Sequence, residues 1–344
     1  MATSKGSSIP SSGNSHDHQD DDASFRVNEL PRARFWDAMD ICQWEGSWFE
    51  PGLVKPAVTF RTTFQAHHDD VLLASPPKTG TTWLKALCLC IMQNPIPIAT
   101  SDIGVNAEAA ADDDDDILAK DNPHFHIQTI ESMIYATKPH PDLYSTPSPR
   151  LFHTHLPYKV LPDSTKNSPG CKIVYITRNP KDTLISLWHF FNSIFRPNGL
   201  EPYPLDRAVD CFCSGVHQYG PFFDHVLEYW LESQKRPTKI LFLKYEELKR
   251  EPKAEVKKLA SFLGRPFASE EEVEKVVWRC SLERLRNLEV NKNGSILYGV
   301  PNSSYFRRGA VGDWKNYLTP ELEEQINRTA CSKFEGSGLC LEDA

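Results

Sequence analysis

The chain has 344 residues, 40% of them hydrophobic, which is enough to bury the core of one large α/β domain or of two smaller domains. Its 38 basic and 46 acidic residues give a net charge of −8, which argues against nucleic acid as a partner. The stretches 17–22 and 112–116 contain nine of the acidic residues, so the rest of the chain is near +1 and is compatible with a basic pocket.

The first 70 residues are predicted to have two parts. Residues 1–24 are rich in Ser and Asp and poor in hydrophobic side chains, which predicts disorder. Residues 25–70 contain aromatic side chains in a context broken by Pro and Gly, and we expect them to form a lid or packing segment of the main domain at 71–344. These aromatic residues are Phe35, Trp36, Trp44, Trp48 and Phe49.

From residue 71 onward, short apolar runs alternate with helical patterns. Runs of four to six residues joined by helices predict a parallel sheet that is covered on both faces. The fold class is therefore α/β, a single domain with a central parallel sheet flanked by helices. The predicted strands are Val71–Ala74, Arg150–Thr154, Lys172–Thr177 and Ile240–Lys244. The predicted helices are Thr81–Gln93, Asp182–Phe195, Leu205–Ser233, Lys253–Leu263, Glu270–Arg279 and Pro320–Phe334.

Two features indicate where the protein resides and what lies on its surface. None of the nine Cys forms a Cys-x-x-Cys pair, and no secretory signal precedes them, so we expect reduced thiols and a cytoplasmic protein. No run approaches 18 apolar residues, so we expect no contact with a membrane. Residues 94–123, with Pro95, Pro97 and the run Asp112–Asp116, are interpreted as a surface insertion.

The stretch 74–87, ASPPKTGTTWLKAL, joins the first predicted strand to the first predicted helix. A turn here exposes backbone N–H groups at a helix N-terminus, where the helix dipole and the Lys78 ammonium favour an anion. Thr79, Thr81 and Thr82 add hydroxyl donors. In the common nucleotide-triphosphate loop the Lys follows the second of two glycines, and that order is absent. An ordinary strand–helix connection with a solvated Lys remains the alternative.

Two further basic segments favour a ligand with more than one anionic group. Arg178 lies at the carboxyl end of a predicted strand, the edge where open α/β sheets bind ligands, and Arg suits bidentate phosphate contacts. Ser186, on the following helix, can face the same crevice. An ion pair between Arg178 and Asp182 remains the alternative. The third segment, Arg307-Arg308-Gly309, either wraps a phosphate or forms a solvated loop.

Four motifs together resemble the cytosolic sulfotransferases, in family-like order and spacing over roughly residues 44–335. They are Pro77–Trp83, Thr154–Pro157, Tyr175–Asp182 and Arg307–Lys315. The likeness is greatest to the plant branch of the family. It rests on Asn291-Lys292, Asn302-Ser303 and Asn316–Pro320.

The resemblance implies an enzyme that moves a sulfuryl group from 3′-phosphoadenosine 5′-phosphosulfate (PAPS) to a hydroxyl of a small acceptor, without a metal ion. It implies that the P-loop-like segment binds the phosphosulfate through Lys78 and the backbone of Thr79–Trp83, Gly80 included. The 3′-phosphate then falls to Arg178, Ser186 and the loop formed by Arg307, Arg308 and Gly309.

The remaining roles concern the base and the adenine. The resemblance places adenine against Trp83, Leu282 and Tyr245. It also makes His155 the candidate base, since a neutral imidazole can accept the proton of the acceptor hydroxyl. Lys78 is then the second catalytic residue, because its charge can neutralise the bridging oxygen of the leaving nucleotide.

The chain departs from the family pattern at several positions. Arg308 replaces a Lys, Leu282 stands where a Phe usually stacks on adenine, and His153 occupies a position that is Lys in many animal members. The animal dimer motif is matched by Lys315, Thr319 and Glu324, but Pro320 replaces its Val. We therefore expect a monomer or a weak homodimer.

The acceptor is the least constrained part of this interpretation. Plant relatives act on flavonols, brassinosteroids, hydroxyjasmonates or desulfo-glucosinolates, and no residue chooses among these. A set of aromatic side chains is expected either to line an apolar pocket or to belong to the core. The set is Trp36, Trp48, Phe49, Phe125, Tyr135, Tyr144, Tyr158, Phe222 and Phe223.

Two other function classes share part of the pattern. A nucleotide kinase would have the same loop-and-sheet layout, but it requires the Gly-Lys-Ser/Thr order and acidic metal ligands. A nucleotide-binding module without catalysis would keep the basic loops and would need no base, whereas His155 is present.

Overall fold

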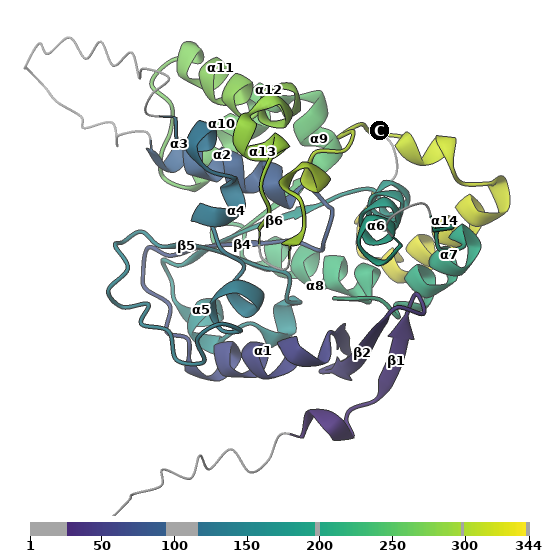
Figure 1. The fold of residues 1–344 in the computed structure, drawn as a ribbon. Coiled ribbons are helices and arrows are strands. Elements are labelled where there is room, and N and C mark those ends of the chain that lie inside the picture. Colours follow the sequence, from purple (N-terminus) through teal and green to yellow (C-terminus); the bar gives the residue numbers. More distant parts are fainter. Residues whose placement is uncertain (1–25, 94–115, 197–199, 297–298, 342–344) are drawn as a thin grey trace, which may run out of the picture.

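The computed structural model describes residues 26–93, 116–196, 200–296 and 299–341 (Figure 1). The predicted disorder of residues 1–24 and most of the predicted surface insertion at 94–123 lie outside the described residues.

Four parallel strands form the centre of the domain, in the order β5-β4-β6-β7. They are β4 (Val71–Ala74), β5 (Leu151–Thr154), β6 (Lys172–Thr177) and β7 (Ile240–Lys244). This arrangement confirms the predicted α/β fold and the predicted strands, with β5 beginning one residue later than expected. Most strand residues are buried because helices cover both faces of the sheet.

Alternate strand residues point into two different cores. Leu73, Ile176 and Leu243 pack with α2, α10 and α11 on one face, above the sheet in Figure 1. Leu72 and Tyr175 pack with α1 and α8 on the other face. These helices are α1 (Pro51–Thr63), α2 (Thr81–Gln93), α8 (Phe222–Lys235), α10 (Pro252–Phe262) and α11 (Glu270–Arg279).

A third core joins α6 (Pro180–Phe195), α7 (Leu205–Ser214) and α14 (Pro320–Phe334) beside the sheet. Short helices occupy most connections. They are α3 (Ile117–Lys120), α4 (Pro123–His126), α5 (Asp163–Asn167), α9 (Tyr245–Arg250), α12 (Leu282–Asn287) and α13 (Glu289–Lys292). Single turns of other helix types are η1 (Val27–Glu29), η3 (Ile130–Ile134), η4 (Tyr158–Val160), η6 (Asn302–Tyr305) and η7 (Asp313–Asn316).

The single helix predicted at Leu205–Ser233 is wrong, because the chain forms two helices there, α7 and α8. Gly215 ends α7 in a left-handed conformation with φ of 78°, which glycine adopts without strain. Pro221 precedes α8 and has no N–H to continue the α7 hydrogen-bond ladder. The hydrophobic periodicity continues across this break, which is why the pattern suggested one helix.

The N-terminal segment contains a small antiparallel sheet that sequence analysis missed. Its strands are β1 (Arg32–Phe35), β2 (Met39–Trp44) and β3 (Ser47–Phe49). Glu45 and Gly46 both have positive φ, the pattern of a two-residue hairpin turn between β2 and β3. The strands are only three to six residues long, so their alternation was too short to recognise. Phe35, Trp36, Trp44 and Phe49 are buried against the rest of the domain.

Asp116, the last residue of the acidic run, is not the solvated charge that the sequence suggested. Its carboxylate is buried and forms ion pairs with Arg279 at 2.6 Å and with Arg284. Its side chain also caps α3 by accepting a hydrogen bond from Leu118 N. The other four Asp residues of the run lie outside the described residues.

The thiols agree with the expectation of reduced cysteines. All nine cysteines are free, including Cys90 and Cys280, whose sulfur atoms lie 3.6 Å apart. Within the described ranges, no helix is long and apolar enough to cross a membrane.

A buried ion pair fixes the amino ends of β4 and β5. Arg150 donates to Asp70 through Nε at 2.7 Å, and its other guanidinium nitrogens donate to the carbonyl oxygens of Leu143 and Gln65, both at 3.0 Å. Both side chains of the pair are at most 2% exposed. The backbone of Asp70 accepts from Lys172 N at 2.8 Å, so the same residue also contacts β6.

Asp70→Asn should lower the free energy of unfolding by about 3–5 kcal/mol, because it leaves the buried Arg150 charge uncompensated. Urea denaturation measures this change. Asp40→Asn is the matched control, since Asp40 pairs with Arg34 in an exposed position where an ion pair contributes about 0–1 kcal/mol. Equal losses for the two variants would contradict the role assigned to the buried pair.

Candidate functional site

A cavity of about 500 Å³ lies at the carboxyl ends of the parallel strands. The loop after β4, His155 after β5, Arg178 after β6 and Tyr245 after β7 all line it. Every predicted site residue except Thr79 lines this cavity. These are Lys78, Gly80, Thr81, Thr82, Trp83, His155, Arg178, Ser186, Tyr245, Leu282, Arg307, Arg308 and Gly309.

The loop between β4 and α2 is shaped by its backbone. Lys78 and Gly80 have φ of 69° and 112°, and a Cβ at Gly80 would lie 2.9 Å from the Tyr245 ring. Only glycine therefore fits at position 80. The Thr79 hydroxyl donates to the Pro76 carbonyl oxygen at 2.8 Å and also lies 3.2 Å from the Ile176 carbonyl oxygen. Thr79 therefore supports the loop instead of facing the cavity.

Lys78 lies between two aromatic rings and has no carboxylate partner among the described residues. Its ammonium is 4.1 Å from the Phe190 ring centre and 5.5 Å from that of Tyr305, and it donates to Ser304 O at 3.4 Å. Burial, followed by the nearby charges of Arg307 and Arg178, lowers the pKa of Lys78 to about 7. An anion in the cavity would supply the missing negative charge.

His155 has a defined tautomer. Its Nδ1 lies 2.7 Å from the carbonyl oxygen of Ser75, so Nδ1 carries the hydrogen and Nε2 keeps a lone pair. Its backbone N–H donates to Glu131 at 2.9 Å, and its carbonyl accepts from His225 at 3.0 Å. Burial lowers the pKa of His155 to about 3, against a smaller opposing effect of the Ser75 hydrogen bond. The ring is therefore neutral at pH 7 and can accept a proton.

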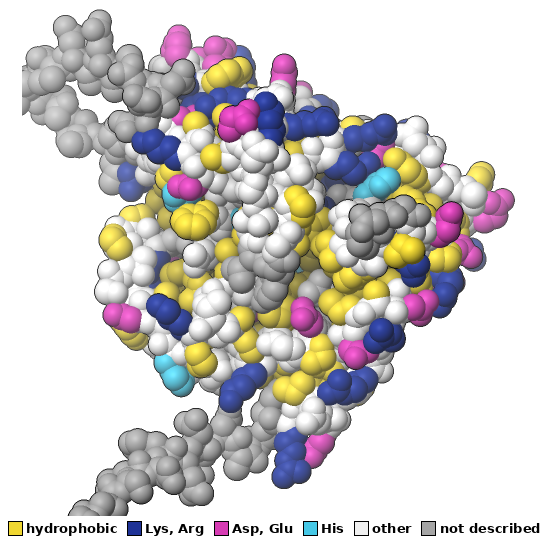
Figure 2. Space-filling view, viewed as in Figure 1, with side chains coloured by type: hydrophobic (Ala, Val, Ile, Leu, Met, Phe, Trp, Pro, Cys, Tyr) yellow, Lys and Arg dark blue, Asp and Glu magenta, His cyan; other side chains and the backbone are white. Residues whose placement is uncertain are grey.

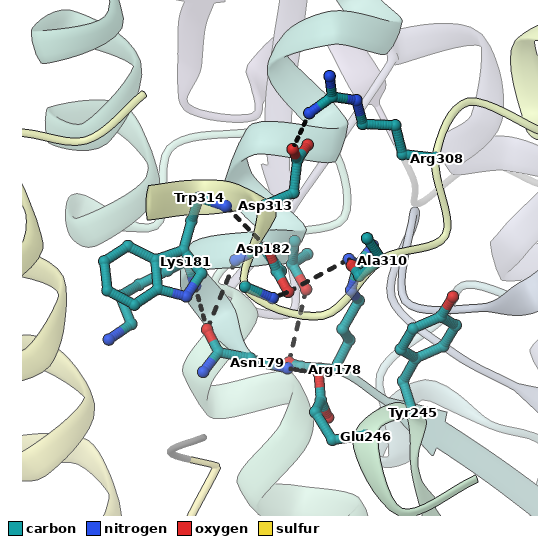
Figure 3. A network of polar contacts seen from close by, with 12 residues as sticks. Arg178, Asn179, Lys181, Asp182, Tyr245, Glu246, Arg308, Ala310, Asp313 and Trp314 are labelled. Carbon is teal, nitrogen blue, oxygen red and sulfur yellow. Dashed lines mark hydrogen bonds and ion pairs between the residues drawn. The ribbon is translucent and has the colours of Figure 1, made fainter. Parts of the chain in front are cut away.

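Arg178 satisfies both interpretations that the sequence left open. Its guanidinium lies 3.3 Å from the Asp182 carboxylate and donates to Ala310 O at 2.6 Å (Figure 3). It also lines the cavity, with Cζ 4.7 Å from the centre of the Tyr245 ring. The ion pair thus positions Arg178 without removing it from the site.

Asp182 binds the distant segment 307–314 to the start of α6 (Figure 3). Its carboxylate accepts hydrogen bonds from Gly312 N at 2.8 Å and from Trp314 N at 3.1 Å. Within that segment, Arg307 and Arg308 form ion pairs with Asp313 at 2.7 and 2.5 Å. These contacts carry both arginines to the rim of the cavity.

Tyr245, Trp83 and Leu282 surround another part of the cavity. The Tyr245 hydroxyl donates to Gly309 O at 2.8 Å, and its ring meets Trp83 edge to face, with centres 5.4 Å apart. Gly309 has φ of 59°, and a Cβ there would lie 2.5 Å from Leu282. Leu282 therefore packs directly against Gly309. The positive φ of this residue is a conformation that glycine adopts more easily than other residues do.

Comparisons with known proteins agree on one family. Residues 68–338 match the family described as "Sulfotransferase domain". The Arabidopsis thaliana protein Cytosolic sulfotransferase 12 is 40% identical over 314 residues, which are 91% of this chain and 92% of the relative. Cytosolic sulfotransferase 1 from the same plant is 42% identical over 308 residues, covering 87% and 88%. This chain belongs to the plant cytosolic sulfotransferase family.

Solved sulfotransferase structures share the fold. A crystal structure of an Arabidopsis thaliana sulphotransferase has a TM-score of 0.71 and 35% identity, and it covers 97% of this chain and 100% of its own. Mouse sulfotransferase SULT7A1, solved in complex with PAP, has a TM-score of 0.65 and 28% identity, covering 87% and 96%. The recognition from four motifs is thereby confirmed, and the names of the relatives agree with the expected cytoplasmic location.

Some lining residues of this sulfotransferase were missed because no motif marks them. Phe190 and Tyr305 cover Lys78, and His124 and Thr129 line the same cavity as the loop between β4 and α2. The only available signal was spacing, since Phe190 follows Ser186 by one helical turn. Lys85, whose ammonium contacts His124 and Thr129, was hidden inside a hydrophobic helix pattern.

The aromatic residues proposed for an acceptor pocket do not line the cavity. Most belong to the hydrophobic cores, whereas Phe125 and Tyr144 are 64% and 69% exposed. The apolar wall is built instead from one face of α6 and from scattered neighbours. Its members include Met39, Leu53, Met133, Phe190, Phe191, Ile194, Phe195, Tyr219, Ile296, Val300 and Phe306.

Proposed function

We propose that this sulfotransferase moves the sulfuryl group of PAPS to a hydroxyl of a small hydrophobic acceptor. The acceptor would be of the flavonoid, steroid, hydroxyjasmonate or desulfo-glucosinolate type. The observation that carries the proposal is that one cavity joins a basic loop, a neutral histidine and an apolar wall. PAPS is a co-substrate that supplies the sulfuryl group and leaves as 3′,5′-adenosine bisphosphate.

The charges of the cavity support a donor with several anionic groups. Lys78, Arg178, Lys249, Arg307 and Arg308 line it, and Glu50 is the one acidic residue among the lining residues that the structure describes. Two of the arginines also have spare donors. Nε of Arg178 and Nε of Arg307 are buried without a hydrogen-bond partner in the described part of the chain. A 3′-phosphate near both arginines would accept from these groups.

His155 is the proposed general base. Its Nε2 lone pair accepts the hydroxyl proton of the acceptor as that oxygen forms a bond to sulfur. Its Nδ1–H remains on Ser75 O, which keeps the ring oriented during the step. The imidazolium that forms is surrounded by other neutral histidines and by Glu131, a buried carboxylate that accepts from the His155 backbone.

Lys78 is the proposed electrostatic partner of the leaving group. When the bond between sulfur and the bridging oxygen breaks, negative charge grows on the bisphosphate, and the Lys78 ammonium stabilises it. Phe190 and Tyr305 restrict the ammonium on the outer side, since their rings lie within 6 Å of it. The desolvated position strengthens the interaction with the developing charge.

The apolar wall supports a hydrophobic acceptor. Phe190, Phe191, Ile194 and Phe195 come from the last two turns of α6 and face Met39 of β2 in the same cavity. In Figure 2 hydrophobic side chains gather across the middle of the molecule, in the region of α6 in Figure 1. None of the wall residues named above is charged, so recognition would depend mainly on shape and burial.

His155→Ala should lower turnover about 10²–10⁴-fold, the range for a positioned general base, while bisphosphate binding changes little. Transfer from labelled PAPS to a panel of the four acceptor types measures turnover, and calorimetry measures binding. Because the pKa of His155 is about 3, its protonation should not reduce wild-type turnover between pH 8 and 5. His140→Ala, at an exposed position, is the control. Near-normal turnover of His155→Ala across pH 6–8 would rule out this base.

Arg178→Ala and Arg307→Ala should each weaken bisphosphate binding by about 1.5–3 kcal/mol, the contribution of a hydrogen bond to a charged group. A nucleotide without the 3′-phosphate should bind the wild type poorly and respond little to either change. Thermal unfolding separates binding from stability, since Arg178→Ala also leaves Asp182 without its ion pair. Arg26→Ala is the control, because Arg26 is exposed and distant in the sequence from both arginines. Equal losses for both nucleotides would place the two arginines elsewhere.

Leu282→Phe should tighten bisphosphate binding by up to about tenfold, because an aromatic ring adds about 0.5–1.5 kcal/mol beyond the area it buries. The ring must fit beside Gly309, against which Leu282 already packs. Calorimetry of wild type, Leu282→Phe, Trp83→Ala and the double mutant measures the effect, with KM for the acceptor expected to stay constant. Weaker binding of Leu282→Phe would mean that this side chain does not cover the adenine.

A further inference from the structure

Lys85, on α2, is completely buried and has no carboxylate within ion-pair distance among the described residues. Its ammonium lies 3.0 Å from His124 Nδ1 and 3.4 Å from Thr129 Oγ1. Burying a lysine in this way is unfavourable, since the charge loses its hydration without gaining a counter-ion. The residue also lies one turn into the helix that begins the phosphate-binding site, so its position calls for a functional explanation.

Two hydrogen-bond chains lead from this ammonium to the loop. The first runs through His124, whose Nε2 lies 2.9 Å from Thr82 Oγ1. The second runs from Thr129 to His153 Nδ1 at 2.9 Å, and from His153 Nε2 to Ser75 Oγ at 3.0 Å. It ends at Thr81, whose hydroxyl is 2.7 Å from that of Ser75. Both terminal threonines line the cavity.

The direction of each chain follows from the hydrogens of the ammonium. An ammonium has donors only, so the His124 nitrogen that faces it must accept, and the opposite nitrogen then carries a hydrogen toward Thr82. In the second chain Thr129 accepts from Lys85 and has its one hydrogen available for His153, so that His153 can donate to Ser75 and Ser75 to Thr81. At the end of each chain, the threonine hydroxyl accepts from behind and keeps its own hydrogen free for a ligand.

We propose that Lys85 is a positioning residue that sets the donor direction of both chains, so that Thr81 and Thr82 donate their hydroxyl hydrogens to the phosphosulfate. The inference rests on the proposed function, because it concerns the same donor. It also gives a role to His153, which transmits the orientation as a neutral ring.

The charges around Lys85 agree with this arrangement. Burial lowers the pKa of Lys85 to about 7, and Glu131 on η3 raises it to a smaller extent. Burial also lowers the pKa values of His124 on α4 and of His153 and His155 at the end of β5, so all three rings are neutral. Lys78 is the other cation that faces this region. A bound anion would raise the pKa of Lys85, so binding should take up a proton at this site above pH 7.

The test is Lys85→Met, which keeps the side-chain length and removes the charge. Binding of 3′,5′-adenosine bisphosphate should weaken about 10–100-fold, the value of one to two hydroxyl donors to an anion. The melting temperature should stay equal or rise, because an unpaired buried charge has been removed. Lys138→Met, at an exposed position, should change neither quantity. A role in folding alone would predict the opposite, lower stability with unchanged affinity.

Two readouts separate this role from simple packing. In a Thr81→Val, Thr82→Val background, Lys85→Met should cause little further loss of affinity, because the chains no longer end in a donor. At pH 8, calorimetry in buffers of different ionisation enthalpy should detect less proton uptake by Lys85→Met than by the wild type. Additive losses, or equal proton uptake, would overturn the proposal.

The same experiment distinguishes an error in the proposed donor from an error in the role of Lys85. If the wild type does not bind the bisphosphate, the proposed donor is wrong, and the role of Lys85 falls with it. If the wild type binds and Lys85→Met binds equally well, only the role of Lys85 is refuted.

Discussion

The carboxylate of Asp182 is the contact on which the site depends. It pairs with Arg178 and accepts from Gly312 N and Trp314 N, and so it joins the start of α6 to a segment about 130 residues later. Together with the hydrogen bonds from Arg178 to Ala310 O and from Tyr245 to Gly309 O, this contact fixes the arginine-rich loop beside the parallel sheet. The carboxylate is completely buried, yet it is matched by one guanidinium and two backbone donors. Such a fully satisfied buried charge is compatible with a stable fold.

The parallel sheet explains why four separate motifs meet. The carboxyl ends of parallel strands lie at one edge, so residues that follow β4, β5, β6 and β7 necessarily approach one another. This is why four of the predicted site residues, Lys78, His155, Arg178 and Tyr245, line one cavity. The arginine-rich loop follows no strand of this sheet, and the resemblance to the family was needed to place it.

Other parts of the structure were beyond reach of sequence reasoning for identifiable reasons. The hairpins at 32–49 depend on turns with positive φ at Trp36, Asp37 and Glu45, residues that rarely adopt that conformation. The apolar wall of the cavity comes mainly from one face of α6, whose aromatic residues have the same spacing as those of a core-facing helix. Hydrophobic periodicity reports which face of a helix is covered, and it does not distinguish a core from a cavity.

The described residues that line the cavity carry an excess of positive charge. Burial lowers the pKa values of Lys78 and Lys85, and neither forms an ion pair with a carboxylate among the described residues. In the same part of the chain, Arg178 and Arg307 each keep a buried Nε without a hydrogen-bond partner. An anionic ligand removes this excess, so the free energy lost in burying the cations is recovered when the donor binds. Neutral histidines keep this excess of positive charge from growing. A protonated His155 would add to the repulsion, whereas the neutral ring leaves the lysine charges for an anion and, in the proposed mechanism, its own lone pair for the acceptor proton.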